Sequence, residues 1–396
     1  MALEQMSPVP ILLMVRELGS GGIERDVTKL ARGLDRSRFT PFVATYRPTG
    51  IRSEELIRAG IPILPLQVSS FKSPRFIATA VQLGRFIRRQ RIKIVHAFDS
   101  TAILGVPLAR LLRVPAILTS TLGHRALLDD RTRQQFRITD HLADAIVVNC
   151  NAMRNHLIDD FSIDAERIRL CYNGVDTKEF YPSEPARADL PGITAEDVVI
   201  GTVCVLRPEK GLEVLQEAFA KARRSFPHVK LLIVGSGPQL DVMNRNSKRL
   251  GIDDASVMLP TVRDVGPVVR AMDIFVSSSH SEAFSNSILE AMASGCCVIA
   301  SRVGGTPELV TDGQTGALFN VGDVDQLAHR LVELIQDSSL RKALGTKAAE
   351  FAADKLNIDI ALRRSMEIYD DLLRRKTLLR QPLVSSNEKS FDWNYR

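Results

Sequence analysis

The sequence predicts an α/β protein with two tandem doubly wound units, each a parallel sheet covered by helices on both faces. A chain of 396 residues is longer than one hydrophobic core usually serves. Short apolar runs alternate with helical patterns over most of this length, which is typical of parallel sheets with crossover helices. A turn-rich stretch from Tyr172 to Gly192 interrupts the alternation, which restarts at Val198.

In the first half of the chain, the apolar run 11–15 predicts a strand, and residues 21–34 predict the helix that follows it. Val27, Leu30 and Leu34 lie on one stripe of that helix, so this face can pack against the sheet. The same alternation predicts strands at 39–45, 92–97, 115–119 and 145–148, with helices at 74–90, 100–112, 131–143 and 151–159.

The second half repeats the pattern, with strands predicted at 198–205, 229–234, 256–259, 274–277 and 297–300. After Asp323 the chain is mostly helical, and its last stretch is polar. We therefore predict a first domain over 1–185, a second domain over 186–365, a long helix over 366–380 and a loose tail over 381–396. A cleft between the domains is the expected ligand site, because open α/β sheets bind ligands at the carboxyl ends of their strands.

The composition is that of a globular protein, with 45% apolar and 25% charged residues, and it excludes a largely disordered or fibrous chain. The longest strictly apolar runs, 11–15 and 296–300, are too short for a transmembrane helix or for the apolar region of a signal peptide. Five cysteines without a C-x-x-C spacing argue against a disulfide framework or a structural zinc site. We expect a cytoplasmic protein.

The segment 56–98 contains eight Lys and Arg residues and no Asp or Glu. Such a field can attract anionic lipid, a phosphorylated acceptor or nucleic acid. Nucleic acid is disfavoured, because few aromatic residues interleave with the basic ones. With lipid as the partner, the protein would lie peripherally at the inner face of a membrane. A solvated basic helix face is an equally good interpretation.

A glycine-rich loop at Gly21 and Gly22 follows the first predicted strand and opens a helix. Glycines let the backbone approach a ligand closely, and a helix N-terminus favours an anion. The loop is not a dinucleotide fingerprint, because Glu24 stands where the third glycine of a motif starting at Gly19 would fall. A plain tight turn is the alternative interpretation.

Two cations, Arg207 and Lys210, follow the strand 198–205 in a loop that Pro208 stiffens. Arg can bind phosphate with two parallel hydrogen bonds, and Lys acts as a point charge, so the pair suits a diphosphate held without metal. A second glycine loop contains Gly237. It indicates either close backbone approach to a ligand or a simple strand-to-helix turn.

The strongest pattern is the segment 279–290, which follows a predicted strand. Ser285 or Asn286 can cap a helix here, which leaves Glu282 in the preceding loop and Glu290 about one turn inside the helix. Carboxylates at these positions can accept hydrogen bonds from ribose or hexose hydroxyls, and the free amides of the helix start would face a phosphate. Two ordinary surface glutamates are the alternative.

Two histidines, His96 and His124, lie at or just past predicted strand ends of the first domain. Each is a candidate for a substrate contact, although a lone histidine is more often structural. Asp323 and Asp325 form a D-x-D pair, which we interpret as first-turn acids of a late helix. We predict no metal.

In their order and spacing, these motifs resemble those of the family-4 glycosyltransferases, retaining enzymes with the GT-B fold. The resemblance runs from about residue 11 to residue 369. It includes G-G-x-E at 21–24, N-G-V-D at 173–176, R-x-x-K-G at 207–211, G-x-G-P at 235–238, E-x7-E at 282–290, E-A-M-A-x-G at 290–295 and G-G-x-P-E at 304–308.

The resemblance implies that the second domain holds a nucleotide-sugar and that the last long helix crosses back to the first domain. Arg207 and Lys210 would bind the diphosphate, Glu290 the ribose and Glu282 the transferred sugar. The implied donor-binding residues are Gly21, Gly22, Arg207, Lys210, Gly237, Thr261, Val262, Glu282, Ala283, Phe284, Ser285 and Glu290. The implied catalytic residues are Arg207, Lys210, Glu282 and His124.

The sequence departs from the family's pattern at two places. Ala283 stands where many members have glycine, which slightly narrows the loop. Many members carry a histidine directly after the strand equivalent to 115–119, where this chain has Ser120 and Thr121, and His124 follows a few residues later.

The resemblance implies a retaining transfer of sugar from a nucleotide-sugar to a glycan or lipid-linked acceptor. No metal and no cofactor are expected, because the cations can stabilise the leaving diphosphate and the donor itself is a substrate. A nucleotide-sugar epimerase of the same fold is one alternative. A catalytically silent sugar-nucleotide binder is another, disfavoured by the presence of Lys210, Glu282 and Glu290.

Overall fold

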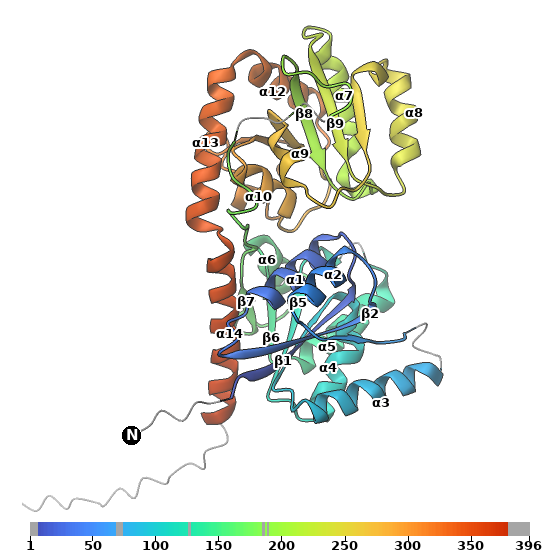
Figure 1. The fold of residues 1–396 in the computed structure, drawn as a ribbon, viewed down its shortest axis with the longest axis vertical. Coiled ribbons are helices and arrows are strands. Elements are labelled where there is room, and N and C mark those ends of the chain that lie inside the picture. Colours follow the sequence, from blue (N-terminus) through green and yellow to red (C-terminus); the bar gives the residue numbers. More distant parts are fainter. Residues whose placement is uncertain (1–6, 69–73, 126–127, 184–186, 188–189, 379–396) are drawn as a thin grey trace, which may run out of the picture.

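The computed structural model describes residues 7–68, 74–125, 128–183, 187 and 190–378, and it consists of two domains, each built on a parallel sheet (Figure 1). The first sheet has the strand order β3-β2-β1-β4-β5-β6-β7 and the second the order β10-β9-β8-β11-β12-β13. The strands of the first sheet are β1 (Val9–Glu17), β2 (Phe39–Arg47), β3 (Ile63–Pro65), β4 (Ile94–Phe98), β5 (Ala116–Thr121), β6 (Ala145–Val148) and β7 (Ile168–Leu170). Those of the second are β8 (Val198–Val203), β9 (Val229–Val234), β10 (Ser256–Leu259), β11 (Ile274–Ser277), β12 (Cys297–Ser301) and β13 (Ala317–Phe319).

Helices cover both faces of each sheet, as the alternating sequence pattern predicts. In the first domain they are α1 (Gly22–Gly33), α2 (Ile51–Arg58), α3 (Pro74–Arg89), α4 (Ala102–Leu111), α5 (Asp130–Leu142) and α6 (Asn151–Asp159). In the second they are α7 (Leu212–Arg223), α8 (Leu240–Leu250), α9 (Gly266–Arg270), α10 (Asn286–Ala293), α11 (Thr306–Leu309), α12 (Val324–Gln336) and α13 (Ser338–Lys355).

The strand order reverses at the centre of each sheet, beside β1 in the first and beside β8 in the second. β1 pairs with both β2 and β4, and β8 pairs with both β9 and β11. In open α/β sheets, such switch points create the crevice in which ligands bind. The glycine loop at Gly21 follows β1, and the Arg207 loop follows β8. Both motifs therefore lie at the switch points.

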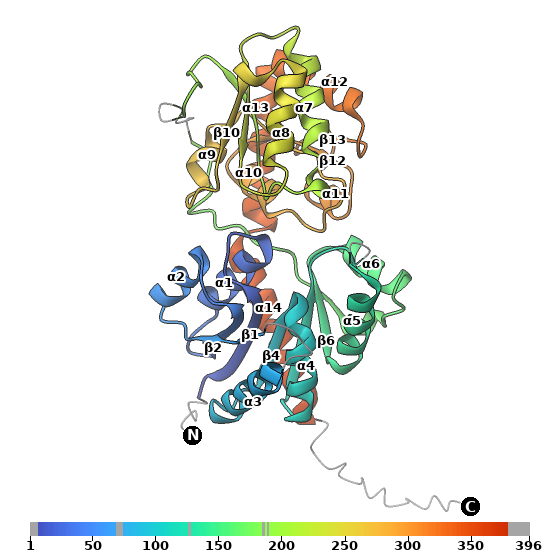
Figure 2. The ribbon, with the colours of Figure 1, turned by 90° about the vertical axis from the view of Figure 1, so that its right-hand side faces the viewer.

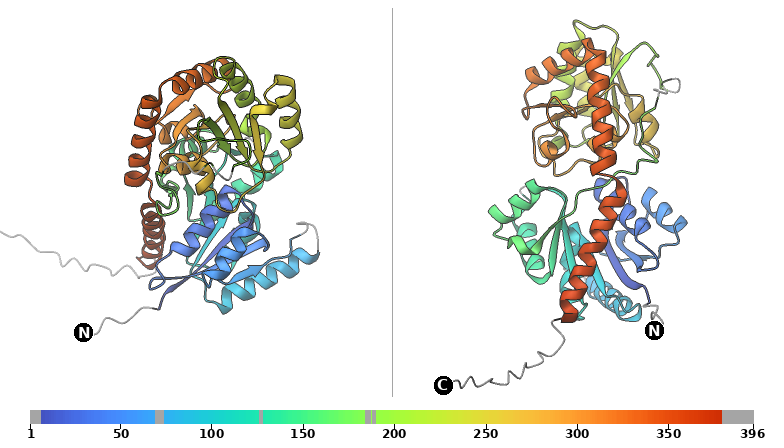
Figure 3. Two further views of the ribbon diagram at one scale, coloured as in Figure 1. Left: turned by 45° about the horizontal axis from the view of Figure 1, so that its top comes forward. Right: turned by 90° about the vertical axis from the view of Figure 1, so that its left-hand side faces the viewer.

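The last long helix, α14 (Ile358–Leu378), runs from the second domain along the first (Figure 3, right). Ile368, Tyr369 and Leu372 pack into the apolar cluster of the first sheet, so the helix crosses back as expected. It begins well before residue 366, because the side chain of Asn357 accepts a hydrogen bond from the backbone of Asp359 at 3.0 Å and starts the helix there. The predicted tail 381–396 lies outside the described residues.

Several short elements are not predicted from the sequence. β3, β7 and β13 have three residues each, too few for an alternating pattern to emerge. β8 ends at Val203, two residues before the predicted strand does.

An apolar cluster also joins the domains, since Cys150 and Met153 pack in one core with Ala283 and Phe284.

Candidate active site

A cavity of about 630 Å³ lies between the two domains, which Figure 2 shows one above the other. Its walls come mainly from loops that follow the carboxyl ends of strands, as in other open α/β sheets. Sequence-predicted residues that line it are Gly21, Gly22, His124, Arg207, Lys210, Thr261, Val262, Glu282, Ala283, Phe284, Ser285 and Glu290.

The N-terminus of α1 opens into this cavity from the first domain. Gly21 is its N-cap residue, and no side chain caps the helix there. Gly22 lies close to α10 of the second domain, because a Cβ at this position would be 3.6 Å from Asn286 Nδ2. A side chain larger than a methyl group would meet that amide. The carboxylate of Glu24 lies over this first turn and accepts a hydrogen bond from its own backbone amide, so a negatively charged ligand would bind the remaining first-turn amides beside it.

The loop after β8 presents its two cations to the same cavity. Residues Pro208–Lys210 form a short 3-10 turn, and Gly211 then adopts a left-handed conformation with φ of 57°. A Cβ on Gly211 would clash with the carbonyl oxygen of Ser278, which follows β11. The Ser278 hydroxyl donates to the carbonyl of Lys210 at 3.1 Å. Glycine here lets the two loops of the second domain touch.

Lys210 and Glu282 form an ion pair, with Lys210 Nζ 2.6 Å from Glu282 Oε2. Ser279 Oγ also donates to this oxygen, at 3.4 Å. Burial lowers the pKa of Lys210, but the charge and hydrogen bond of Glu282 outweigh burial, so the pKa lies above its ordinary value. The ammonium group is thus firmly charged. The Arg207 side chain is largely exposed, and its Nη1 lies 3.8 Å from Oε1 of Glu209.

The loop carrying Glu282 rests on two glycines after β12. The amide of Gly305 donates to the carbonyl of Ala283 at 2.7 Å. Gly304 has φ of 51°, and a Cβ there would clash with the carbonyl oxygen of Glu282. The G-G-x-P-E motif therefore gives the Glu282 loop its position.

Ser285 caps α10, as the sequence predicts, by accepting from the amide of Ile288. Glu290 lies one turn into this helix and is only 1% exposed. Its Oε1 forms an ion pair with Arg25 Nη1 of α1 and lies 4.0 Å from Lys29 Nζ. Its Oε2 is buried and has no hydrogen-bond partner among the described residues.

A second contact ties α1 to α10: Asn286 Nδ2 donates to Asp26 Oδ1 at 2.9 Å. Burial raises the pKa of Asp26 to about 6. Neither Arg25 nor Asp26 is singled out by the sequence, although both follow the Gly21 loop directly. The apolar stripe of α1 predicts which face of this helix packs against its own sheet. It does not predict which residues of the second domain the opposite face contacts.

One predicted site residue, Gly237, does not line the cavity. From this glycine loop, Gly235 lines the cavity, whereas the sequence predicts that Gly237 does. Gly237 instead packs against the backbone of Leu206, whose amide nitrogen would be 2.7 Å from an added Cβ. It therefore supports the Arg207 loop from behind.

The two histidines differ in surroundings. His124 lines the cavity, and its ring centroid is 4.5 Å from that of His156. Burial and the neighbouring His156 lower the pKa of His124. His96 is buried, with Nδ1 2.8 Å from the Tyr369 hydroxyl of α14 and Nε2 2.8 Å from Ser120 Oγ. His96 therefore joins the crossing helix to the first sheet.

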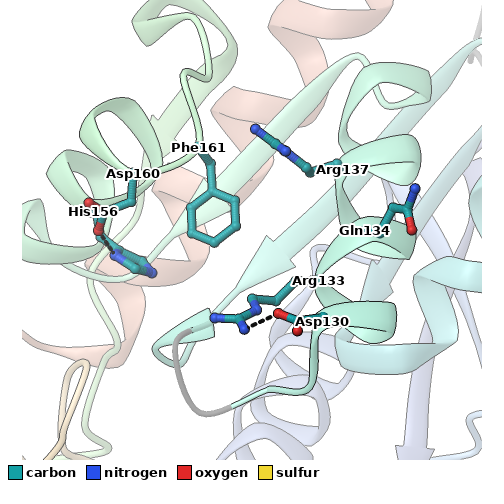
Figure 4. Close-up of a pocket in the computed structure, with 7 residues that line it drawn as sticks. All are labelled: Asp130, Arg133, Gln134, Arg137, His156, Asp160 and Phe161. Atoms are coloured by element: carbon teal, nitrogen blue, oxygen red, sulfur yellow. Dashed lines mark hydrogen bonds and ion pairs between the residues drawn. The ribbon is translucent and has the colours of Figure 1, made fainter.

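A groove of about 510 Å³ between α5 and α6 begins beside His156 (Figure 4). Arg133 pairs with Asp130 on one wall, and His156 pairs with Asp160 on the other. Arg137 extends from α5 in the direction of Phe161. The groove thus offers a cation and an aromatic ring on the first domain.

Within the described parts of the chain, no group of three His, Cys, Asp or Glu residues could hold a metal ion. The D-x-D pair is used elsewhere, because Asp323 caps α12 and Asp325 pairs with Lys221. The same described parts contain no helix that is long and apolar enough to cross a membrane.

A cleft between two parallel-sheet domains, crossed by a C-terminal helix, defines the GT-B class of glycosyltransferases. Residues 20–179 match the family described as Glycosyltransferase Family 4, and residues 189–351 match that described as Glycosyl transferases group 1. The GDP-mannose-dependent alpha-(1-6)-phosphatidylinositol monomannoside mannosyltransferase of Mycolicibacterium smegmatis is 32% identical over 293 residues, or 69% of this chain and 75% of that protein. The chain belongs to the group 1, family 4 glycosyltransferases.

Other similarities are shorter or more distant. The N-acetyl-alpha-D-glucosaminyl L-malate synthase of Bacillus anthracis is 29% identical over 208 residues. The similarity covers 52% of this chain and 54% of that relative, so the chain spans about half the length of that relative. Among solved structures, Anabaena Alr3699/HepE in complex with UDP-glucose has a TM-score of 0.80 at 22% identity, covering 91% of this chain and 99% of that one. At this identity, the similarity establishes the shared fold.

Proposed function

We propose that this glycosyltransferase moves a sugar from a nucleoside diphosphate sugar to an acceptor hydroxyl and retains the anomeric configuration. The observation that carries the proposal is the Lys210–Glu282 pair, set in the same cavity as the N-terminus of α1. Relatives support a donor of this class, because one is named as GDP-mannose-dependent and one is solved with UDP-glucose.

The charges of the site suit this chemistry. When the bond between the anomeric carbon and the diphosphate breaks, negative charge develops on the leaving oxygen and positive charge on the sugar ring. Lys210, Arg207 and the amides of α1 would stabilise the first, and the Glu282 carboxylate would lie near the second. The acceptor oxygen forms the new bond on the same face, and its proton passes to the leaving phosphate. This route needs no carboxylate nucleophile.

We propose that transfer is independent of metal, because Arg207 and Lys210 supply two positive charges where a divalent ion would otherwise sit. We also propose that a glycan or lipid-linked acceptor occupies the first domain, at His124 and the groove of Figure 4. An aromatic ring and a guanidinium group, such as those of Phe161 and Arg137, suit a sugar with an acidic substituent.

A panel of nucleoside diphosphate sugars tests the proposal. A bound donor at about 100 times its dissociation constant should stabilise the protein by roughly 2.7 kcal/mol, visible as a thermal shift. Released nucleoside diphosphate measures turnover, and the NMR coupling of the anomeric proton in the product reports retention. A thermal shift without turnover on any acceptor would leave a silent binder, and no shift with any donor would refute the donor site.

Variants locate the activity. Lys210→Ala should lower turnover by about 10²- to 10³-fold, the usual loss when one charge stabiliser is removed from a transition state. Glu290→Ala should weaken donor binding. Lys210→Ala should fold, because the residue lines a cavity rather than fills a core, whereas Glu290→Ala also leaves the Arg25 guanidinium without its partner and should lower the melting temperature. Lys221→Ala is the matched control, since it removes an exposed lysine paired with Asp325.

A further inference from the structure

Arg25 reaches from α1 of the first domain into the second and meets Glu290 in α10. Both residues line the cavity between the domains. Burial lowers the pKa of Arg25, but the charge and hydrogen bond of Glu290 outweigh it, so the guanidinium is fixed in its charged form. An ion pair with so little exposure restricts both side chains to one arrangement.

The pair uses only one oxygen of the carboxylate. Oε1 meets Arg25, whereas Oε2 is buried without a hydrogen-bond partner among the described residues. A buried carboxylate oxygen without a donor is costly, which indicates that a donor is supplied by a ligand. Because Glu290 lines the cavity, a hydroxyl group bound there can be that donor.

We propose that Arg25 is a positioning residue for the donor ribose: by holding Oε1 of Glu290, it turns Oε2 toward a ribose hydroxyl. The proposal rests on the proposed function, which places a nucleoside diphosphate in the cavity. Its consequence is that ribose recognition requires both domains. Glu290 is supplied by the second domain, and the group that orients it is supplied by the first.

A second interdomain ion pair provides a matched control. Arg263 of the second domain pairs with Glu54 of α2 at 2.5 Å, and both side chains are exposed. Arg263→Gln therefore removes an interdomain ion pair that does not involve Glu290. If ribose recognition depends only on how firmly the domains are docked, both arginine variants will behave alike. If it depends on orientation of Glu290, only Arg25→Gln will change it.

The experiment measures the dissociation constants of UDP, GDP and ADP and of their 2′-deoxy and 3′-deoxy forms by calorimetry. The wild-type protein should prefer a ribonucleotide over at least one deoxy form by about tenfold. Arg25→Gln should weaken the ribonucleotide by about tenfold, within the usual range for coupled sites, while the deoxy form changes little. The ratio of the dissociation constants of the deoxy form and the ribonucleotide then falls toward one. Arg263→Gln should keep the preference.

Lys29, 4.0 Å from Glu290 Oε1, still compensates the carboxylate in Arg25→Gln, so the variant is expected to fold. Should it not, Arg25→Lys retains the charge without the planar fork and should show an intermediate preference. A preference unchanged in the arginine-25 variants, or lost equally in Arg263→Gln, would overturn the inference and leave the proposed function intact. Tighter ribonucleotide binding in Arg25→Gln would also overturn it. Binding of none of the three nucleotides by wild type would refute both.

Discussion

Glu308 of the second domain holds Asn151 of the first: one carboxylate oxygen accepts from the backbone amide and from the side-chain amide of Asn151, each at 2.9 Å. The other carboxylate oxygen of Glu308 accepts a hydrogen bond from the backbone amide of Ala152 at 2.9 Å. Glu308 therefore caps α6 from across the domain boundary. The hydroxyl of Tyr172, in the connection between the domains, donates to the same carboxylate at 2.8 Å. The motif residue Glu308 thus joins the two domains beside the segment that connects them.

Replacing Glu308 should loosen the contact between the domains. Glu308→Ala removes a helix cap worth about 1 kcal/mol and leaves the Tyr172 hydroxyl without its acceptor. We expect a lower melting temperature and a larger radius of gyration by small-angle X-ray scattering. Asp323→Ala is the control, because it removes a cap within the second domain. A Glu308→Ala protein with the wild-type radius of gyration would show that Glu308 does not hold the domains together.

Gly304→Ala should damage donor binding through the Glu282 loop. The added Cβ would clash with the Glu282 carbonyl, and a displacement of about 1 Å at a reacting site can cost 10²-fold in rate. Gly313→Ala is the matched control. Gly313 also has a positive φ, 71°, but nothing lies within 4 Å of its added Cβ. Both variants should lose about 1–2 kcal/mol of stability to backbone strain, and Gly304→Ala should lose more because of its clash with the Glu282 carbonyl. Only Gly304→Ala should lose turnover.

His96 should make the protein sensitive to acid. Burial lowers the pKa of His96 to about 3, whereas an unfolded histidine titrates near 6.5. Between these values the unfolded state binds the extra proton, so stability is fully present above pH 6.5 and falls by roughly 1.4 kcal/mol per pH unit as the pH drops toward 3.

His96→Gln should therefore be less stable than wild type at pH 7.5, because it disturbs the bonds to Tyr369 and Ser120, but its melting temperature should fall less steeply between pH 6.5 and 4.5. His329→Gln removes an exposed histidine and serves as the control. Parallel pH profiles for wild type and His96→Gln would show that His96 is not the group responsible.

Chelation should leave most of the turnover intact. Arg207 and Lys210 supply the positive charge at the proposed diphosphate site, and the D-x-D pair is engaged in capping α12 and in pairing with Lys221. The measurement is the initial rate with and without excess EDTA, using protein purified without added metal. Loss of activity that magnesium or manganese restores would reject the mechanism based on the two cations.

Helix α3 should give salt-sensitive binding to anionic vesicles. Its exposed face combines Arg85, Arg88 and Arg89 with Ile77 and Val81, which are 69% and 44% exposed. Each basic residue near an anionic surface contributes about 1 kcal/mol, which salt screens. Lys72, which lies in the same basic segment, falls outside the described residues.

Flotation with anionic and with neutral vesicles, at low and high salt, measures this binding. Arg88→Ser/Arg89→Ser should reduce recovery with anionic vesicles. Arg245→Ser/Lys248→Ser removes two exposed charges from α8 and should not. Equal recovery of the wild-type protein under every condition would leave α3 as a solvated basic face.

Sequence patterns alone are sufficient to predict the two parallel sheets and the loops that carry the site. Apolar runs followed by helical stripes predict strands such as β1 and β8, because burial on both faces requires continuous apolar residues. Gly21, Arg207 and Glu282 could be placed in the loops after these strands for the same reason, since each lies within a few residues of such a run. Short edge strands and the start of α14 at Ile358 carry too little local pattern to be predicted.

The contacts between residues distant in the sequence become visible in the folded protein alone. Arg25 and Glu290 are 265 positions apart, and Asn151 and Glu308 are 157 apart. No local period encodes such contacts, because they depend on how two separately folded sheets dock. The same holds for Gly304, whose missing side chain matters only because the Glu282 loop lies against it. Local burial patterns therefore predict the domains and their loops, whereas docking determines which side chains form the site.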